Sequence, residues 1–339
     1  MTRFVLPPPP TVRSVIGTVG GSGPPARSQI VGPGRHKMIE VSDLVKRYGR
    51  ATAVDGLTFT VRPGRVTGFL GPNGAGKSTT MRLILGLERA SEGRVLIDGR
   101  PLRELDRPIT RVGALLDASR VHSGRTARDH LRVIAAANGV GDRRVDACLE
   151  LAGLAAVAGR RIRGFSLGMR QRLGIAAALL GDPGVLLFDE PANGLDAEGV
   201  QWVRTLMRDL AAEGRTVFVS SHLMAEMQNT ADHLIVIGRG RLLADAPIGD
   251  LMATASLGIR VPEAKTGTAV GLLAQAGGDV TVDGGDLLVK GLDAARAGEL
   301  LLKGGIPIVH LAERRSSLEE AYLELTGEAV EYRALEGQS

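Results

Sequence analysis

Hydrophobic positions follow a regular pattern only from about residue 38 onward. Residues 1–37 contain "PPPP" and "GGSGPPARS", and they offer too little apolar surface to offset the entropy lost on ordering. We therefore predict a disordered Pro/Gly-rich extension over 1–37, which also lacks the continuous apolar core of a secretory signal. From Met38, apolar and polar residues alternate through "MIEVSDLVKRYGRATAVDGLTFTVRPG", as they do in antiparallel strands, and translation could start at Met38 as well as at Met1.

Short apolar runs and longer amphipathic segments then alternate along the chain. The runs "VTGFL", "GVLLFDEP" and "RTVFVSSH" predict buried strands, and "GVQWVRTLMRDLAAEG" predicts a helix between the last two. Residues from about 113 to 180 are expected to be mostly helical, and "ADHLIVIGRGRLLADA" is typical of a hairpin. Because strands alternate with helices, the pattern indicates an α/β fold with a mostly parallel sheet.

The pattern changes after about residue 255, where it predicts a small α+β domain. "GDVTVDGGDLLVKG" indicates a hairpin, "AARAGELLLKGG" a helix, "IPIVHLAE" a strand and "SLEEAYLELTG" a closing helix. We therefore divide the chain into the extension 1–37, a main domain over 38–252 with a helical insert at about 113–180, and an accessory domain over 255–339.

Composition narrows the choice of partners. The formal charge of +5 and a pI of about 9.7 would suit binding to nucleic acid or to an anionic membrane. The chain has 36 Arg but only 6 Lys, however, and we interpret this excess of arginine as a bias towards GC-rich codons. No Lys/Arg tract with interleaved aromatic residues occurs, so we expect no nucleic acid partner. The single Cys148 cannot form an internal disulfide, which fits a reducing compartment. No apolar run of about 18 residues occurs, so any membrane role would require a partner.

The stretch "GFLGPNGAGKSTTMRLILGL" carries the first chemical signal, G-x-x-x-x-G-K-S. A predicted strand ends here, glycines turn the backbone, and a helix begins near Lys77, so that N–H groups converge where an anion can bind. Lys77 would reach the β- and γ-phosphates, and the Ser78 hydroxyl would hold Mg²⁺. A chance glycine-rich turn is the alternative, which the order of strand, loop and helix disfavours. The predicted phosphate contacts are Gly71, Pro72, Asn73, Gly74, Ala75, Gly76, Lys77, Ser78 and Thr79.

Two further strands end in polar residues. In open α/β sheets, ligands lie beyond the carboxyl ends of the strands. Asp189 is therefore placed to hold Mg²⁺ through its water shell, and Glu190 to act as general base toward the attacking water. His222 ends the next buried strand, 33 residues after Asp189, and we interpret it as a sensor of the γ-phosphate. A lone histidine is more often structural, and that alternative remains open.

The segment "FSLGMRQRLGIAAALL" predicts a second helix N-terminus directed at an anion. Ser166 is a suitable N-cap, and Gly168 lets the backbone approach a ligand closely. One helix N-terminus already faces the proposed phosphates, so the second one requires a separate explanation.

These motifs, in this order, resemble those of the ATPases of ABC transporters over roughly residues 38 to 250. The resemblance implies a P-loop NTPase cassette with an antiparallel β subdomain and a helical subdomain. It also implies that the signature segment with Ser166 and Gly168 closes over ATP held by a second copy, giving a homodimer with two composite sites. Tyr48 matches the residue that stacks on adenine, although it could be a rim residue of the core. Asp196 matches a contact to the opposing phosphate loop.

Within this family, "SLGMRQRL" and "SLEEAYLELTG" resemble the ATPase subunits of drug-resistance exporters of the daunorubicin and bacitracin types. The resemblance implies ATP and Mg²⁺ as cofactors, and ATP hydrolysis that powers a separately encoded integral-membrane permease at the cytoplasmic face of the cell membrane. The cargo would be a drug, an antibiotic or another amphipathic compound. One departure is Asp117, at a position that normally holds Gln or Glu. It would contact Mg²⁺ or the water, and its short carboxylate makes that contact indirect.

Other classes of ATPase fit less well. A chromosome-maintenance ATPase needs a long coiled coil between the phosphate loop and the signature, but only 89 residues without heptads separate Lys77 from Ser166. A ribosome-associated ATPase carries two cassettes, and this chain carries one. Intact Lys77, Asp189, Glu190 and His222 argue against an inactive scaffold.

The arginines of the helical insert form either a solvated face or a surface for a permease loop or lipid headgroups. They are Arg120, Arg125, Arg128, Arg132, Arg143 and Arg144.

Overall fold

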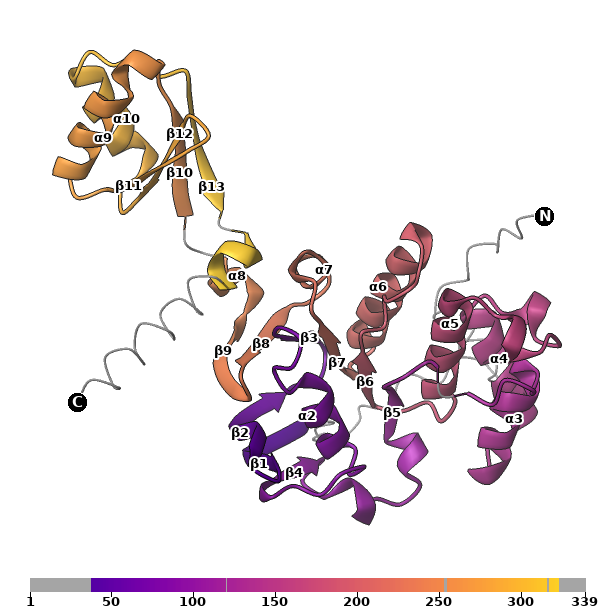
Figure 1. Cartoon of the computed structure of the whole chain (residues 1–339). Helices are drawn as coiled ribbons and strands as arrows, with labels where there is room; N and C mark the ends of the chain where they lie inside the picture. Colours follow the sequence, from indigo (N-terminus) through magenta and orange to yellow (C-terminus); the bar gives the residue numbers. More distant parts are fainter. Residues whose placement is uncertain (1–37, 120, 253–254, 316, 323–339) are drawn as a thin grey trace, which may run out of the picture. The chain divides into compact units, whose positions relative to one another are not determined.

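The computed structural model describes residues 38–119, 121–252, 255–315 and 317–322, so the disorder predicted for 1–37 lies outside the described residues. Its contacts divide the chain after Asp245 into two compact units (Figure 1). We call residues 38–245 the N-terminal unit and residues 246–322 the C-terminal unit. The division lies slightly before the boundary at 252–255 that the sequence pattern predicts.

A six-stranded sheet forms the centre of the N-terminal unit. Neighbouring pairs from β5 through β6, β7 and β3 to β8 are parallel, and β9 follows β8 through a two-residue turn. Arg239 and Gly240 in that turn have φ of 50° and 81°, the left-handed conformations of a tight hairpin. The predicted α/β class and hairpin are thus confirmed. In sheet order the strands are β5 (Val112–Leu115), β6 (Val185–Asp189), β7 (Thr216–Ser221), β3 (Val66–Leu70), β8 (His233–Gly238) and β9 (Arg241–Pro247).

A separate three-stranded antiparallel sheet packs against the central one, as the alternating pattern after Met38 predicts. Phe59 of this sheet lies 5.8 Å and 5.9 Å, between ring centroids, from Phe69 and Phe218 of the central sheet. Only 3% of the residues in the chain are aromatic, and these three phenylalanine rings pack together in a core that is mostly aliphatic. The strands, in the order β2, β1, β4, span Ala51–Val61, Ile39–Tyr48 and Glu92–Ile97.

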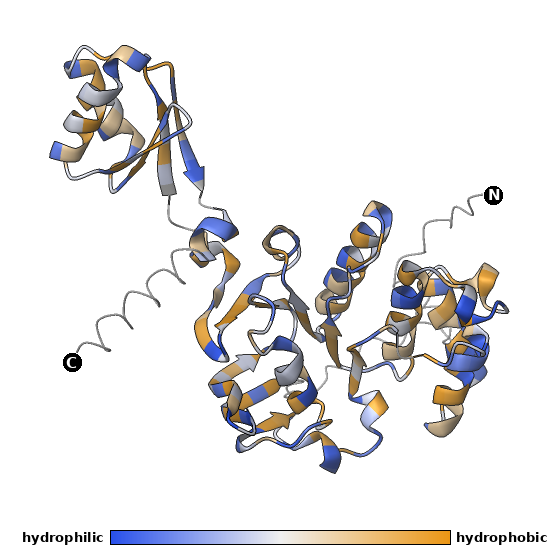
Figure 2. Ribbon diagram, in the orientation of Figure 1, coloured by the Kyte–Doolittle hydropathy of each residue, from blue (hydrophilic) through white to orange (hydrophobic). Residues whose placement is uncertain are grey.

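The helical part of the N-terminal unit begins later than predicted. Val112–Leu115 is an edge strand instead, because this short apolar run pairs with β6 and packs under α5. Gly113 allows that packing, since a Cβ there would lie 2.0 Å from the Ala178 carbonyl oxygen. Figure 2 shows the mixed hydropathy expected of half-buried helices such as α6. The α-helices are α2 (Lys77–Ile84), α3 (Ala127–Ala137), α4 (Asp142–Leu151), α5 (Leu167–Ala178), α6 (Ala197–Ala212) and α7 (Met224–Gln228).

The C-terminal unit is a βαββαβ arrangement with the antiparallel strand order β11-β12-β10-β13. This is the split βαβ topology of ferredoxin-like domains. Helices α9 and α10 cover one face of the sheet and bury a small aliphatic core (Figure 1). The elements are α8 (Ile248–Leu251), β10 (Ala255–Arg260), α9 (Thr266–Gln275), β11 (Asp279–Asp283), β12 (Asp286–Lys290), α10 (Ala294–Lys303) and β13 (His310–Arg315).

Two details of the C-terminal pattern differ from expectation. The strand predicted over "IPIVHLAE" starts only at His310, because Pro307 lacks an N–H group to donate to a sheet. Of the predicted closing helix, 318–322 is helical, and the rest lies outside the part of the chain that the structure describes.

Candidate nucleotide-binding site

The glycine loop joins β3 to α2, as predicted, and its glycines are required by close packing. A Cβ on Gly71 would lie 2.5 Å from the Ile237 carbonyl oxygen, and a Cβ on Gly76 would lie 2.5 Å from the Ala53 carbonyl oxygen. Gly76 also has φ of 104°, which only glycine adopts readily, and it stands at the N-cap of α2. The loop is therefore held against β8 and β2, with the N-terminus of α2 behind it.

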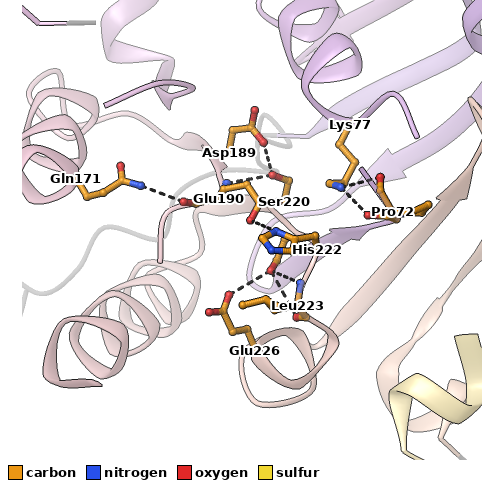
Figure 3. A network of polar contacts seen from close by, with 11 residues as sticks. Pro72, Lys77, Gln171, Asp189, Glu190, Ser220, His222, Leu223 and Glu226 are labelled. Carbon is orange, nitrogen blue, oxygen red and sulfur yellow. Dashed lines mark hydrogen bonds and ion pairs between the residues drawn. The ribbon is translucent and has the colours of Figure 1, made fainter. Parts of the chain in front are cut away.

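Lys77 is buried at the start of α2. Its ammonium nitrogen donates to the carbonyl oxygens of Gly71 at 2.5 Å and Pro72 at 3.2 Å (Figure 3). Burial lowers the pKa of Lys77, and the negative charges of Glu190 and Asp189 partly offset that effect. A partly desolvated ammonium group beside an open cleft interacts strongly with an anion, because little water screens it.

Asp189 ends β6 and is held by the neighbouring strand β7. One of its carboxylate oxygens accepts the Ser220 hydroxyl. No cluster of three or more His, Cys, Asp or Glu side chains that could hold a metal occurs among the described residues. Magnesium does not need such a cluster, since it is usually bound by one or two protein oxygens together with phosphates and water. The hydroxyl of Ser78 and the carboxylate of Asp189 are hard oxygen donors that fit this requirement.

Glu190 follows directly and has an unusual backbone. Its φ is 50°, in the left-handed region that non-glycine residues rarely adopt. Its N–H donates to the Ser220 hydroxyl at 3.1 Å, and its carbonyl oxygen accepts from the Gln171 side chain at 3.1 Å. The Glu190 carboxylate contacts Nδ1 of His222 at 2.8 Å (Figure 3). The structure therefore brings the predicted base and the predicted sensor into direct contact.

A cleft opens between the glycine loop and the ends of β6 and β7. It unites most of the loop residues with Glu190 and His222, as the sequence predicts. Among the described residues, the lining consists of Ala53, Pro72, Asn73, Gly74, Gly76, Lys77, Ser78, Thr79, Glu190, Asn193 and His222. Gly71 and Ala75 belong to the same loop but do not line the cleft.

The second predicted helix N-terminus exists but does not line this cleft. The Ser166 hydroxyl accepts from the Met169 N–H at 3.2 Å and caps α5, as expected. Gly168 packs on the following loop, where a Cβ would lie 3.0 Å from the Gly194 carbonyl oxygen. Asp196 caps α6 through the Gly199 N–H at 2.8 Å. Within one chain, Ser166, Gly168 and Asp196 thus lie outside the cleft around Lys77.

Tyr48 is a half-exposed residue at the end of β1. Its hydroxyl donates to the Glu88 carboxylate, and this bond is the main reason why its pKa is raised. The Lys46 ammonium lies 4.8 Å from the centroid of the ring. An exposed ring held at its hydroxyl end is suited to stacking on a base, but Tyr48 does not line the cleft.

Asp117 follows the edge strand β5, whose neighbour β6 carries Asp189. Its carboxylate accepts from the Ser119 N–H at 2.8 Å and from the Ser119 hydroxyl at 2.6 Å. It does not line the cleft, so its predicted contact with Mg²⁺ or water stays a prediction.

Three residues of the site were not singled out from the sequence. Gln171 and Ser220 hold the backbone of Glu190, and Asn193 lines the cleft. Asn193 falls in the "NGLD" motif and could have been proposed from it. The contacts of Gln171 and Ser220 depend on how α5 and β7 pack beside β6, which no local pattern encodes.

Comparison with known proteins decides the family. The family described as ABC transporter matches residues 54–193. An uncharacterized ABC transporter ATP-binding protein of Bacillus subtilis, YhcH, is 34% identical over 87% of this chain and 97% of its own length. The chain belongs to the ATP-binding proteins of ABC transporters. Within this family, the bacitracin transport ATP-binding protein BcrA of Bacillus licheniformis is 34% identical over 86% of this chain and 97% of its own.

Solved structures agree with the fold of an ABC ATPase. A dimeric structure of a bacterial ABC transporter cassette matches with a TM-score of 0.58 and 25% identity, covering 62% of this chain and 98% of that one. Residues 255–319 match a separate family, described as a domain of unknown function (DUF8746). The protein is thus an ABC ATPase that hydrolyses ATP. No helix in the described parts of the chain is long and apolar enough to cross a membrane.

Proposed function

We propose that this ABC ATPase powers a separately encoded membrane permease that exports a drug, an antibiotic or another amphipathic compound. The observation that carries the proposal is the convergence of the glycine loop, Asp189 and the Glu190–His222 pair at one edge of a parallel sheet. The name of the bacitracin transport relative, together with its match over most of both chains, supports the choice of export cargo.

The loop residues bind the triphosphate of ATP. Backbone N–H groups around Gly74 and Gly76 and the N-terminus of α2 face the phosphates, and Lys77 exchanges its loop carbonyl contacts for β- and γ-phosphate oxygens. Ser78 and Asp189 would hold Mg²⁺, which neutralises phosphate charge when it is bound. Tyr48 stacks on the adenine.

Glu190 acts as the general base. Its carboxylate accepts a proton from the water whose oxygen attacks the γ-phosphorus, while the bond to the β–γ bridging oxygen breaks and leaves ADP. His222 contacts the same carboxylate at 2.8 Å, and so it orients the base and senses the γ-phosphate beside it.

Two copies of the chain complete each site. The N-terminus of α5, capped by Ser166, lies outside the cleft of its own chain, which leaves it available to the ATP of a partner. Asp196 contacts the partner's glycine loop. The resulting two-fold homodimer binds two ATP molecules at its interface and sits at the cytoplasmic face of the membrane through the permease.

The variant Glu190→Gln tests this function. The carboxamide keeps the shape and loses the base, so turnover should fall about 10²- to 10⁴-fold while ATP binding persists. An ATP-dependent dimer should then accumulate on size-exclusion chromatography. Glu150→Gln, which changes an exposed carboxylate on α4, is the matched control and should behave as the wild type. A Glu190→Gln protein that stays monomeric in saturating Mg-ATP would contradict the composite site.

The export cargo needs its own test. Cells that express the chain together with its permease should survive a higher concentration of a bacitracin-type peptide antibiotic than cells that express the permease with the Glu190→Gln chain. Equal sensitivity of the two strains to this and other amphipathic drugs would argue against drug export.

A further inference from the structure

Helix α5 contacts Glu190 directly in its own chain. Gln171, only 6% exposed, donates from Nε2 to the Glu190 carbonyl oxygen at 3.1 Å (Figure 3). The other end of the same amide, Oε1, is buried and has no hydrogen-bond partner in the described chain. Among the described residues, the Gln171 side chain therefore makes its hydrogen bond through Nε2 to Glu190 alone.

The backbone of Glu190 needs such support. A non-glycine residue with φ near 50° is strained, and it keeps that conformation only where its surroundings hold it. Ser220 holds the N–H side of the residue. On the other side, the carbonyl oxygen accepts from Gln171 at 3.1 Å and from the Asn193 N–H at 3.2 Å. Asn193 belongs to the turn that follows Glu190, so Gln171 is the donor that ties this carbonyl to helix α5. Between these two anchors, the Glu190 side chain is directed to His222 and the cleft.

The first turn of α5 also packs on the loop that follows Glu190. A Cβ on Gly194 would lie only 2.3 Å from Cδ2 of Leu167, so the two residues are in close contact. Gly168 also lies close to the same loop, since a Cβ there would be 3.0 Å from the Gly194 carbonyl oxygen. Helix α5 thus touches both ends of the segment 190–194.

We propose that Gln171 is a positioning residue that acts within its own chain. It ties the helix whose N-terminus serves the partner's ATP to the base that serves the ATP of the same chain. A shift of α5 on closing over the partner's nucleotide would then be transmitted to Glu190, which couples the two composite sites. This inference rests on the dimer proposed above.

The variant Gln171→Met removes the donor but keeps a side chain of similar length and leaves no buried unpaired amide. We expect kcat to fall about five- to tenfold, the equivalent of one hydrogen bond, with little change in KM for ATP and no fall in melting temperature. Gln201→Met, on the exposed face of α6, is the matched control and should keep the wild-type kcat. A Gln171→Met protein with wild-type kcat would overturn the proposal.

A double-mutant cycle shows whether Gln171 acts through Glu190. In the Glu190→Gln background there is no base to position, so adding Gln171→Met should leave the slow residual turnover unchanged. A further five- to tenfold loss in that background would mean that Gln171 acts elsewhere, and it would overturn the proposal without affecting the assignment of Glu190. A Glu190→Gln protein with normal turnover would instead overturn the proposed function.

Mixed dimers distinguish action within a chain from action across the interface. In one dimer, Gln171→Met in one chain is paired with Glu190→Gln in the other, so the only intact base lies beside the altered Gln171. In the second dimer, one chain carries both changes and its partner is wild type. The two chains carry different affinity tags, and the dimers are purified on both. We expect the first dimer to turn over five- to tenfold more slowly than the second. The reverse order would show that Gln171 acts on the partner's site, and the proposal would be wrong.

Discussion

The two units of this chain use similar elements but arrange them differently, and the cleft that gathers reactive side chains among the described residues lies in the N-terminal unit. In the central sheet of the N-terminal unit, the neighbouring strands β6, β7 and β3 run parallel, so their carboxyl ends meet at one edge. Lys77 follows β3, Glu190 follows β6 and His222 follows β7, and all three line one cleft. The strand direction thus collects residues that lie far apart in the sequence.

The C-terminal unit is antiparallel throughout, and strand ends alternate between its two edges. Several of its described charged residues pair with each other at the surface. Arg260 donates to Asp286 at 2.6 Å and 2.8 Å, and Arg314 donates to Glu320 at 2.9 Å. These exposed pairs are typical of a solvated surface. Strand direction, more than composition, therefore decides where an ATPase site can form.

A pair of lysine substitutions tests this contrast most strongly. Lys77→Ala removes the charge that is proposed to face the phosphates, and turnover should fall by at least about 10²-fold. Lys303→Ala changes an exposed lysine at the end of α10, paired with Glu299, and should leave turnover unchanged. Steady-state ATPase assays on both variants decide the matter. Equal losses of turnover in the two variants would contradict the claim that the ATPase site lies in the N-terminal unit.

Cys148 offers a probe of the N-terminal unit alone, because it is the only cysteine in the chain. Burial in α4 raises the pKa of its thiol to about 11, from a usual value near 9. The reactive thiolate is therefore about a hundredfold rarer at pH 8 than for an exposed cysteine. Labelling by iodoacetamide, which reacts with the thiolate, should be slow in the folded protein at pH 8, and it should accelerate as the pH is raised or when the unit unfolds. Fast labelling of the native protein at pH 8 would show that α4 is not packed as described.

Two helix N-caps provide the finest comparison. Ser166 caps α5, and Asp293 caps α10 by accepting from the Arg296 N–H at 2.7 Å. Replacing either residue with Ala should cost its unit about 0.5–2 kcal/mol of stability. Only Ser166→Ala should also slow ATP hydrolysis, since of these two helices only α5 is proposed to serve a nucleotide. Calorimetry measures the loss of stability, and ATPase assays measure the loss of activity. An equal loss of activity in Asp293→Ala would contradict the special role of α5.

Most of the catalytic edge was predictable because each part of it has a local signature. The glycine loop from Gly71 to Ser78, the strand ending at Asp189 and the cap at Ser166 all lie where periodicity and motif place them. The secondary structure of short segments was harder to predict from the sequence. Val112–Leu115 is too brief to distinguish a strand from a helix start, and its strand pairing depends on β6.

Contacts between distant segments were not predictable. The bond from Gln171 to Glu190 joins residues on different elements, and the left-handed φ of Glu190 has no sequence marker comparable to a glycine. Tyr48 and Asp117 were placed through resemblance alone, and within one chain neither lines the cleft. The contacts that orient the side chains of the site could therefore not be predicted from the sequence.

The central claim is that the cleft around Lys77 is completed by Ser166 and Gly168 of a second copy. Complementation between two inactive proteins, Lys77→Ala and Ser166→Arg, tests it directly. Each homodimer has two defective sites, but a mixed dimer collects both lesions in one site and leaves the other intact. Mixing should therefore restore ATPase activity toward half of the wild-type value in the mixed dimers, together with ATP-dependent dimerisation in a Glu190→Gln background. If mixing restores neither activity nor dimerisation, the signature helix and the glycine loop do not meet across a subunit boundary, and the composite site is wrong.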